Sequence, residues 1–254
     1  MHEIVLFLAG LVVGIMNAVA GGGLLVGFPV MLAVGMTPLS ANVTGHLVVL
    51  PGNVSASYGD RKYLKKLNRK YLYLLIPNIL GAFIGAMLLS HTTTENFENL
   101  IPVLIGFAVA LFAFQPYLHF HLNRHIRGLV KGVRPLVFIG LAIIPLAIYG
   151  GYFGAGYGFI MLAFLGFTKM HEIHQMNGLK NLSALCISLV SLAVLIPTGQ
   201  VNWKYGLIMA LGCGLGSYYG AVLTQKISNH SLRIIIIVIG VITAGFLAFR
   251  AYST

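Results

Sequence analysis

Residues 4–34 read IVLFLAGLVVGIMNAVAGGGLLVGFPVMLAV, and this stretch decides the fold. Its first apolar run, Ile4–Ala20, stops at Gly21-Gly22-Gly23. Its second run, Leu24–Val34, is too short to cross a bilayer alone, because a spanning helix needs about 20 apolar residues. The stretch therefore predicts a pair of helices broken at glycine.

The second half of the chain has the same arrangement. The apolar run Leu136–Tyr152 precedes Gly154-Ala155-Gly156-Tyr157-Gly158, and the run that follows, Phe159–Phe167, is again short. Glycine lets the backbone turn sharply and approach a ligand closely. Since each glycine block stands before a short helix, the free N–H groups and positive dipole end of that helix favour an anion.

The composition places these helices in a membrane. Hydrophobic residues make up 58% of the 254 residues and charged residues only 8%, against about 25% charged in an ordinary soluble domain. This excludes a soluble enzyme, a DNA-binding protein and a disordered chain, so we expect the lipid bilayer and no nucleic acid as a partner. The apolar stretches are continuous, which predicts an all-α polytopic membrane protein.

The remaining spans and the loop charges predict the orientation. Six further spans are Asn42–Tyr58, Lys70–Ser90, Leu100–Tyr117, Met176–Ile196, Trp203–Thr224 and Leu232–Phe249. Basic residues gather in alternate connections, chiefly Asp60–Lys70 and His119–Arg134, and none occurs in Thr37–Ala41, His91–Asn99 or Thr198–Asn202. Basic loops face the cytoplasm, so we expect an inner-membrane protein with both termini outside.

Shifting the chain by 135 residues aligns its two halves. Ala20, Gly21 and Gly23 fall on Ala155, Gly156 and Gly158, Asn42 falls on Asn177, and Gly81, Gly85 and Ala86 fall on Gly216, Gly220 and Ala221. We predict two inverted repeats, each a glycine-broken short helix pair plus three full transmembrane helices. The repeats are residues 1–118 and 135–254, joined by a basic cytoplasmic segment, 119–134. This architecture is typical of secondary transporters.

The predicted membrane interior has polar side chains and no carboxylate, since all five acids lie in loops or at the terminus. This argues against a cation or metal substrate, and against a membrane enzyme that needs carboxylates or metal ligands. Two helical stripes related by the shift are expected to line a shared cavity: Asn42, His46, Val49, Asn53 and Ala56, and Asn177, Asn181, Ala184, Ser188 and Ser191.

Several of these residues have two interpretations. Lys180 is either a charge that attracts an anion or a side chain that snorkels to the cytoplasmic surface. His46 is either a proton acceptor or a hydrogen-bonded core residue. Asn53, Ser188 and Ser191 fit hydrogen bonding between helices better than substrate binding. Tyr152 and Tyr157 either offer hydroxyl donors or pack in the core. A separate set of glycines has the spacing of close helix packing: Gly81, Gly85, Gly212, Gly216 and Gly220.

These motifs, in this order and spacing, resemble the sulfite exporter TauE/SafE family of membrane permeases. The resemblance rests on Gly10, Gly14, the glycine block 20–23, Pro29 and Ala41-Asn42-x-Thr44 in the first half, and on residues 150–158, Asn177-x2-Lys180-Asn181, Gly199-x-Val201-x-Trp203 and Gly216-x3-Gly220-Ala221 in the second. It implies export or uptake of small sulfur-containing anions such as sulfite, thiosulfate or organosulfonates.

We therefore predict a secondary transporter that moves such an anion by alternating access. The expected substrate-binding residues are Gly21, Gly22, Gly23, Asn42, Thr44, His46, Gly156, Tyr157, Gly158, Asn177, Lys180 and Asn181. No catalytic residue, metal or cofactor is expected. The alternatives are a channel-like pore for a small solute and a membrane-embedded enzyme acting on a lipid-linked substrate, and homo-oligomerisation is left open.

Overall fold

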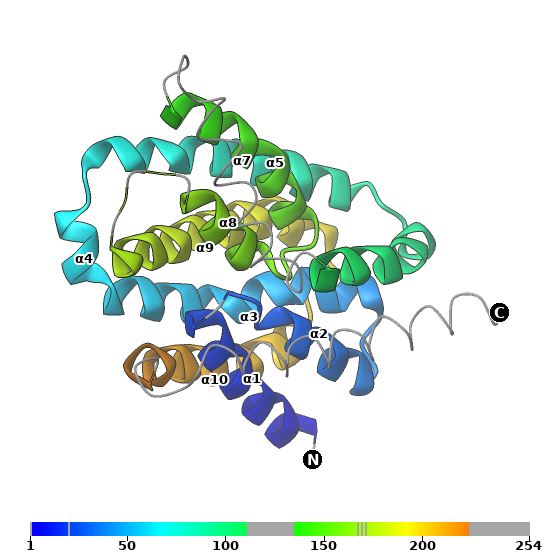
Figure 1. Cartoon of the computed structure of the whole chain (residues 1–254). Helices are drawn as coiled ribbons and strands as arrows, with labels where there is room; N and C mark the ends of the chain where they lie inside the picture. The colour runs from blue at the N-terminus through cyan, green and yellow to red at the C-terminus, as the bar shows by residue number, and fades with distance from the viewer. Residues whose placement is uncertain are drawn as a thin grey trace.

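A computed structural model describes residues 2–19, 21–110, 135–166, 168, 170 and 172–223, and these residues form helices without β-strands (Figure 1). The α-helices are α1 (His2–Val19), α2 (Leu24–Ala33), α3 (Pro38–Gly59), α4 (Arg61–Lys66), α5 (Leu75–Ser90), α7 (Pro135–Tyr152), α8 (Tyr157–Leu165), α9 (Ile173–Leu195) and α10 (Trp203–Leu223). Residues 94–110 are also helical, and 3-10 turns occupy Arg69–Leu74 (η1) and Ile196–Thr198 (η2). The predicted all-helical architecture is confirmed for this part of the chain.

The axes of the long helices α3, α5 and α9 lie roughly side by side across the view of Figure 1, and α4 lies beyond their left-hand end. The chain passes along α3 and α5 in opposite directions, because α4 and η1 connect them at that end. Helix α9 is central, since it packs against α3 on one side and α5 on the other. Helix α10 packs along α1 and α3, and α7 packs along α5. The short helices α2 and α8 follow α1 and α7 directly in the chain.

Both predicted breaks occur at the glycine blocks. Gly21, between α1 and α2, has a φ of +85°, and Gly154 and Gly156, between α7 and α8, have φ values of +76° and +83°. Residues with a Cβ pay a steric cost in this left-handed region. The glycines therefore let the chain leave one helix and start the next within a few residues.

Small residues bring the long helices together, as their spacing predicted. A Cβ at Gly81 or Gly85 of α5 would collide with the backbone of α7, and one at Gly212 or Gly216 of α10 would collide with the backbone of α1. Gly220 lies equally close to Ile15 of α1. These glycines let helix backbones approach within van der Waals contact, as in other membrane bundles.

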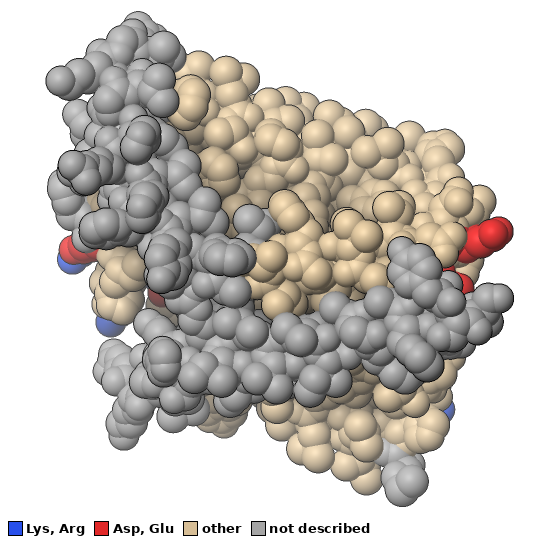
Figure 2. Space-filling model, turned by 45° about the vertical axis from the view of Figure 1, so that its right-hand side comes forward, with Lys and Arg blue, Asp and Glu red and all other residues tan. Residues whose placement is uncertain are grey.

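The surface of the described part is that of a membrane protein. The segments Arg69–Ser90 and Ile173–Thr198 are long and apolar enough to span a bilayer, and α1, α2 and most of α7 are shorter apolar helices. In Figure 2 the charged atoms of the described residues lie toward the left and right edges, and the described residues visible between them are uncharged. Large apolar side chains such as Leu80, Phe83 and Leu211 are exposed, as expected where lipid tails cover them.

The predicted span Lys70–Ser90 begins as the 3-10 turn η1 before α5 continues it. The basic connection Asp60–Lys70 folds into α4 and η1, with its lysines and arginines exposed. The connecting segment 119–134, with its histidines and basic residues, and the predicted span Leu232–Phe249 lie outside the described residues.

Candidate functional site

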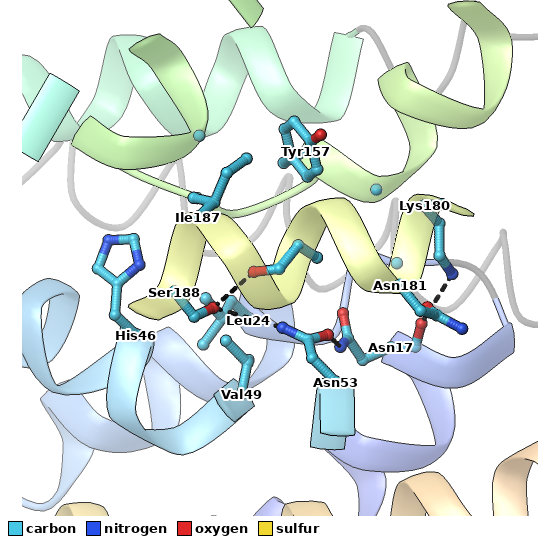
Figure 3. A pocket seen from close by; sticks show the side chains of 15 residues that line it. Asn17, Leu24, His46, Val49, Asn53, Tyr157, Lys180, Asn181, Ile187 and Ser188 are labelled. Atoms are coloured by element: carbon cyan, nitrogen blue, oxygen red, sulfur yellow. Dashed lines mark hydrogen bonds between the residues drawn. The ribbon is translucent and has the colours of Figure 1, made fainter. Parts of the chain in front are cut away.

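A cavity of about 30 Å³ lies where the helix breaks meet α3 and α9 (Figure 3). Its lining comes from α1, α2, α3, α7, α8, α9 and the turns between them: Asn17, Gly21, Leu24, His46, Val49, Asn53, Gly150, Gly154, Tyr157, Gly158, Lys180, Asn181, Ala184, Ile187 and Ser188. At least 10–15 Å³ of such space is needed to hold one water. The cavity therefore suits a small polar solute or ion and not a large organic molecule.

The two polar stripes predicted from the sequence do face one another across this cavity. His46, Val49 and Asn53 come from α3, and Asn181, Ala184 and Ser188 come from α9. The outer members of the stripes, Asn42, Ala56, Asn177 and Ser191, do not line it. The 3.6-residue period of each helix places the middle three residues of each stripe on the facing surfaces.

Lys180 supplies a buried positive charge to the cavity wall. Its side chain is 1% exposed, so it does not snorkel to the surface of the described structure. The ammonium donates to the backbone carbonyl of Asn17 at 3.2 Å, near the end of α1. An ammonium has three donors, so this bond leaves Lys180 able to contact a ligand as well.

A chain of hydrogen bonds holds three of the lining helices in register. The Asn17 amide of α1 donates to Asn53 Oδ1 of α3 at 2.8 Å, and the Asn53 amide donates to Ser188 Oγ of α9 at 3.3 Å. The Ser188 hydroxyl in turn donates to the carbonyl of Ala184. Hydrogen bonding between helices is therefore confirmed for Asn53 and Ser188. The hydroxyl of Ser191 is buried without a hydrogen-bond partner among the described residues, so for that residue the same expectation stays a prediction.

His46 lies at the other end of the lining from Lys180 (Figure 3). The side chain is 2% exposed, and its Nε2 atom has no hydrogen-bond partner among the described residues. Asn181 Oδ1 is likewise buried without a partner in the described part of the chain. A buried polar atom left without a partner costs free energy. Water in the cavity could donate to Asn181 Oδ1, and water or a ligand could pair with His46 Nε2.

Asp60 lies in the loop where the sequence placed it, but it is buried within the protein. This loop residue is only 9% exposed, because it folds back against the start of α9. Its Oδ2 atom accepts hydrogen bonds from the Asn181 amide at 3.0 Å and the Asn177 amide at 3.3 Å. Burial raises the pKa of the Asp60 carboxyl, and the charge of Lys180 partly offsets this effect.

Asn42 and Thr44 lie away from the main cavity. The Asn42 amide donates to the carbonyl of Tyr152 at 2.8 Å, where α7 ends, and Asn42 lines a smaller cavity of about 10 Å³ with apolar neighbours of α2 and α3. Thr44 Oγ1 accepts from the backbone N–H of Asn202 at 3.0 Å. Thr44 therefore fixes the turn before α10.

Some of the glycines predicted to bind substrate line the cavity, and the others pack against neighbouring helices or cap one. Gly21 and Gly158 line the cavity and contact one another through their Cα atoms. Gly22 packs on the ring of Phe159, Gly23 on the backbone of Val13, and Gly156 caps α8. The first turns of α2 and α8 nevertheless reach the cavity through Leu24 and through Tyr157 and Gly158. In these turns the backbone N–H groups of Leu25 and Val26 donate to carbonyls of the first glycine block, and those of Tyr157 and Phe159 donate to carbonyls of the second.

The two tyrosines do not offer their hydroxyls to the cavity. Tyr157 lines it with its ring, and its hydroxyl donates to Asn78 Oδ1 at 2.6 Å on the far side. Tyr152 Oη is 3.2 Å from Thr92 Oγ1. Both belong to the packing of the surrounding helices.

Sequence reasoning missed Asn17, Gly150, Gly154 and Asp60 as parts of the site or its surroundings. Asn17 is the single amide in an otherwise apolar helix, which was a usable signal. Asp60 gave none, because a loop acid beside six basic residues is normally solvated.

Comparison with known proteins identifies the family of a chain with this buried lysine and these amides at two broken helices. The sequence matches the sulfite exporter TauE/SafE family over residues 6–247. The chain belongs to the sulfite exporter TauE/SafE family. It is therefore a multi-pass membrane protein of a transporter family.

Three relatives illustrate the match. The chain is 31% identical over 243 residues to a probable membrane transporter protein of Haemophilus influenzae, covering 92% of this chain and 89% of that protein. It is 29% identical to the probable membrane transporter protein ORF9 of Sinorhizobium sp, covering 94% and 89%. It is 26% identical to the probable membrane transporter protein YfcA of Escherichia coli K12, covering 98% and 90%. No solved structure matches the chain significantly.

Proposed function

We propose that this protein is a secondary transporter for a small sulfur-containing anion of the sulfite, thiosulfate or organosulfonate type, and that the anion binds in the cavity beside Lys180. One observation carries the proposal: Lys180, a residue only 1% exposed, lines a cavity between the two helix breaks. A buried charge in a membrane protein is costly and is functional by default. An anion is the ligand that this positive charge attracts.

The rest of the lining suits an anion that has lost its water. The first turns of α2 and α8 present the positive ends of two helices. The Asn181 amide and the imidazole of His46 supply further polar groups, and an imidazole donates when it is protonated. A sulfur oxyanion offers several acceptor oxygens, so it can use several of these donors at once.

We also propose that the two halves, 1–118 and 135–254, are inverted repeats that rock against one another, joined by the segment 119–134. The hydrogen bonds at the two helix breaks support this proposal, because they cross between the halves in opposite directions, from donor residues 135 positions apart to acceptor residues 134 positions apart. Asn42 donates to the carbonyl of Tyr152, and Asn177, 135 residues later, donates to the carbonyl of Ala18 at 3.5 Å. Asn53 and Ser188, also 135 residues apart, bond to one another.

In the proposed orientation, the basic loop with α4 faces the cytoplasm and both termini lie outside. The exposed lysines and arginines of 61–70 support this orientation. The Lys180 end of the cavity then lies toward the cytoplasm and the His46 end toward the outside. Binding at the middle of the site would let either end open in turn.

Flux into proteoliposomes tests the proposal. The purified protein would be reconstituted and offered labelled thiosulfate, sulfite, methanesulfonate and sulfate, with acetate and chloride as anions of other chemistry. We expect saturable flux of at least one sulfur anion that Lys180→Gln removes. Lys204→Gln is the matched control, because Lys204 is 70% exposed and pairs with Glu3 at 2.8 Å. Absence of sulfur-anion flux, or equal flux in Lys180→Gln, would contradict the proposal.

A further inference from the structure

Asp60 is the one buried acid among the described residues, and Lys180 is the one lysine or arginine buried there. Asn181, the residue after Lys180, lines the cavity and also donates to Asp60 Oδ2 at 3.0 Å. The charges of Asp60 and Lys180 act on one another. The site without substrate therefore contains one positive and one negative charge and is neutral as a whole.

Entry of an anion changes this balance. A monovalent anion beside Lys180 brings the buried groups to a net charge of −1 if Asp60 stays ionised. Excess charge is expensive in a buried site. Uptake of one proton by Asp60 restores neutrality, with Lys180 positive, the anion negative and the carboxyl neutral.

We propose that Asp60 is the proton-coupling residue of this transporter: binding of a monovalent anion at Lys180 is accompanied by transfer of one proton from the cytoplasmic solution to the Asp60 carboxylate. This inference rests on the proposed function. The proton is taken from water or buffer and no other bond is made or broken. The same proton leaves when the anion leaves, so the two move together.

The contacts of Asp60 connect this proton to the shape of the site. Asp60 is the residue between α3 and α4, and its carboxylate holds the amides of Asn177 and Asn181 at the start of α9. Asn177 and Lys180 in turn donate to Ala18 and Asn17 at the end of α1. A neutral carboxyl accepts hydrogen bonds less strongly than a carboxylate, so its protonation loosens the cytoplasmic ends of three helices.

Only one of the two ends of the site has a buried acid among the described residues. At the opposite end, Asn42 donates to the Tyr152 carbonyl, and the groups that correspond to Asn181, Lys180 and Asp60 by the shift of 135 are His46, Gly45 and Leu195. The acid is therefore confined to the end that we place at the cytoplasm. Burial, which raises the pKa of Asp60 above its usual range, brings its protonation closer to neutral pH.

Among the described residues, few other titratable groups lie near Asp60. Lys180 and His174, both on α9, act on it through their charges. His174 stacks on Tyr63 with ring centroids 4.6 Å apart. The neighbouring Arg61 turns away and donates to the carbonyl of Tyr58 at 2.9 Å. His46 faces the other end of the cavity, and it is the competing proton acceptor that the test must separate from Asp60.

Calorimetric titration of the purified full-length protein with methanesulfonate counts the protons. This probe stays ionised at all relevant pH values, so any proton taken up belongs to the protein. Titrations near neutral pH in two buffers of different ionisation enthalpy give the number of protons bound per anion. We expect about one for the wild type, with affinity that rises by up to roughly tenfold per unit fall in pH.

Four variants assign that proton. Asp60→Asn should bind the probe without proton uptake and with no pH dependence, whereas Asp60→Glu keeps the uptake. Glu172→Gln, which removes an exposed acid from the N-terminus of α9, should take up the same number of protons as the wild type. His46→Gln should still take up a proton, whatever its affinity. This variant decides the matter if Asp60→Asn does not fold.

The outcomes separate the two proposals. If the wild type binds none of the sulfur anions, the proposed function fails. If the wild type binds the probe with no proton uptake, or if the uptake persists in Asp60→Asn or disappears in His46→Gln, the coupling role of Asp60 is overturned while the proposed function stands.

Discussion

Replacing Lys180 by Gln should weaken the binding of a divalent anion more than that of a monovalent one. Two unit charges about 4 Å apart attract by about 4 kcal/mol at an effective dielectric constant of about 20. Lys180 also donates to Asn17 and faces the charge of Asp60, so we take half of this figure as the loss for a monovalent anion. That loss, about 2 kcal/mol, corresponds to roughly 30-fold in affinity.

The Coulomb term doubles for a divalent anion, while the hydrogen bonds from the helix ends and the amides remain. The loss then becomes about 4 kcal/mol, or roughly a thousandfold. Methanesulfonate and thiosulfate form a suitable monovalent and divalent pair, with dissociation constants measured by calorimetry in the wild type, Lys180→Gln and the surface control Lys204→Gln. Equal losses for the two anions would refute the electrostatic role of Lys180. No loss at all would place the substrate elsewhere.

Three further predictions follow from the structure. Gly156→Ala should destabilise the protein by about 1–2 kcal/mol, because Gly156 has a φ of +83°, which strains a residue with a Cβ even though that Cβ would meet only Ala108, at 3.6 Å. Thermal unfolding measures the loss. Gly106→Ala is the control and should not lose stability, because Gly106 lies in a helix where a Cβ would enter open space. Asn53→Leu should lower the free energy of unfolding by about 1–3 kcal/mol, because it leaves the buried Asn17 amide without its acceptor. The same measurement should give a much smaller loss for Ser191→Ala, because the Ser191 hydroxyl has no partner among the described residues. Cysteines or tags at the two termini should be labelled only from outside the cytoplasm, and a cytoplasmic C-terminus would contradict the inverted topology.

The broken helices and the two polar stripes could be predicted from the sequence because local signals specify them. Glycine runs interrupt apolar runs wherever they occur, and the 3.6-residue period places His46, Val49 and Asn53 on one face of a helix without knowledge of the fold. The same period places Asn181, Ala184 and Ser188 on the opposing face. The cavity is formed where these faces meet.

Helical periodicity could not predict the contacts of the residues that lie outside the cavity. Asn42 and Asn177 have the same sequence context, but each helix extends beyond the cavity, so their amides meet the ends of α7 and α1 instead. Thr44 lies only two residues from Asn42 on a different face of α3, and it bonds to the chain before α10. Such positions depend on where the helices cross.

Asp60 illustrates a second limit. Its sequence neighbours Arg61 and Lys62 predict a solvated loop, and those side chains are exposed as expected. The carboxyl is nevertheless buried because the turn from α3 to α4 packs against α9, where a Cβ at Gly178 would lie 3.1 Å from Asp60 Cβ. Tertiary packing thus places the acid beside Lys180, and no local pattern reports it.

Counterflow in proteoliposomes tests the central claim most directly. Vesicles loaded with unlabelled thiosulfate would be diluted into a trace of labelled thiosulfate at equal pH on both sides. The account predicts transient accumulation of label above its equilibrium level in the wild type and none in Lys180→Gln, because a carrier whose site is exposed alternately exchanges one bound anion for another. Label that only equilibrates in the wild type would indicate a pore, and accumulation that survives in Lys180→Gln would contradict binding at this site.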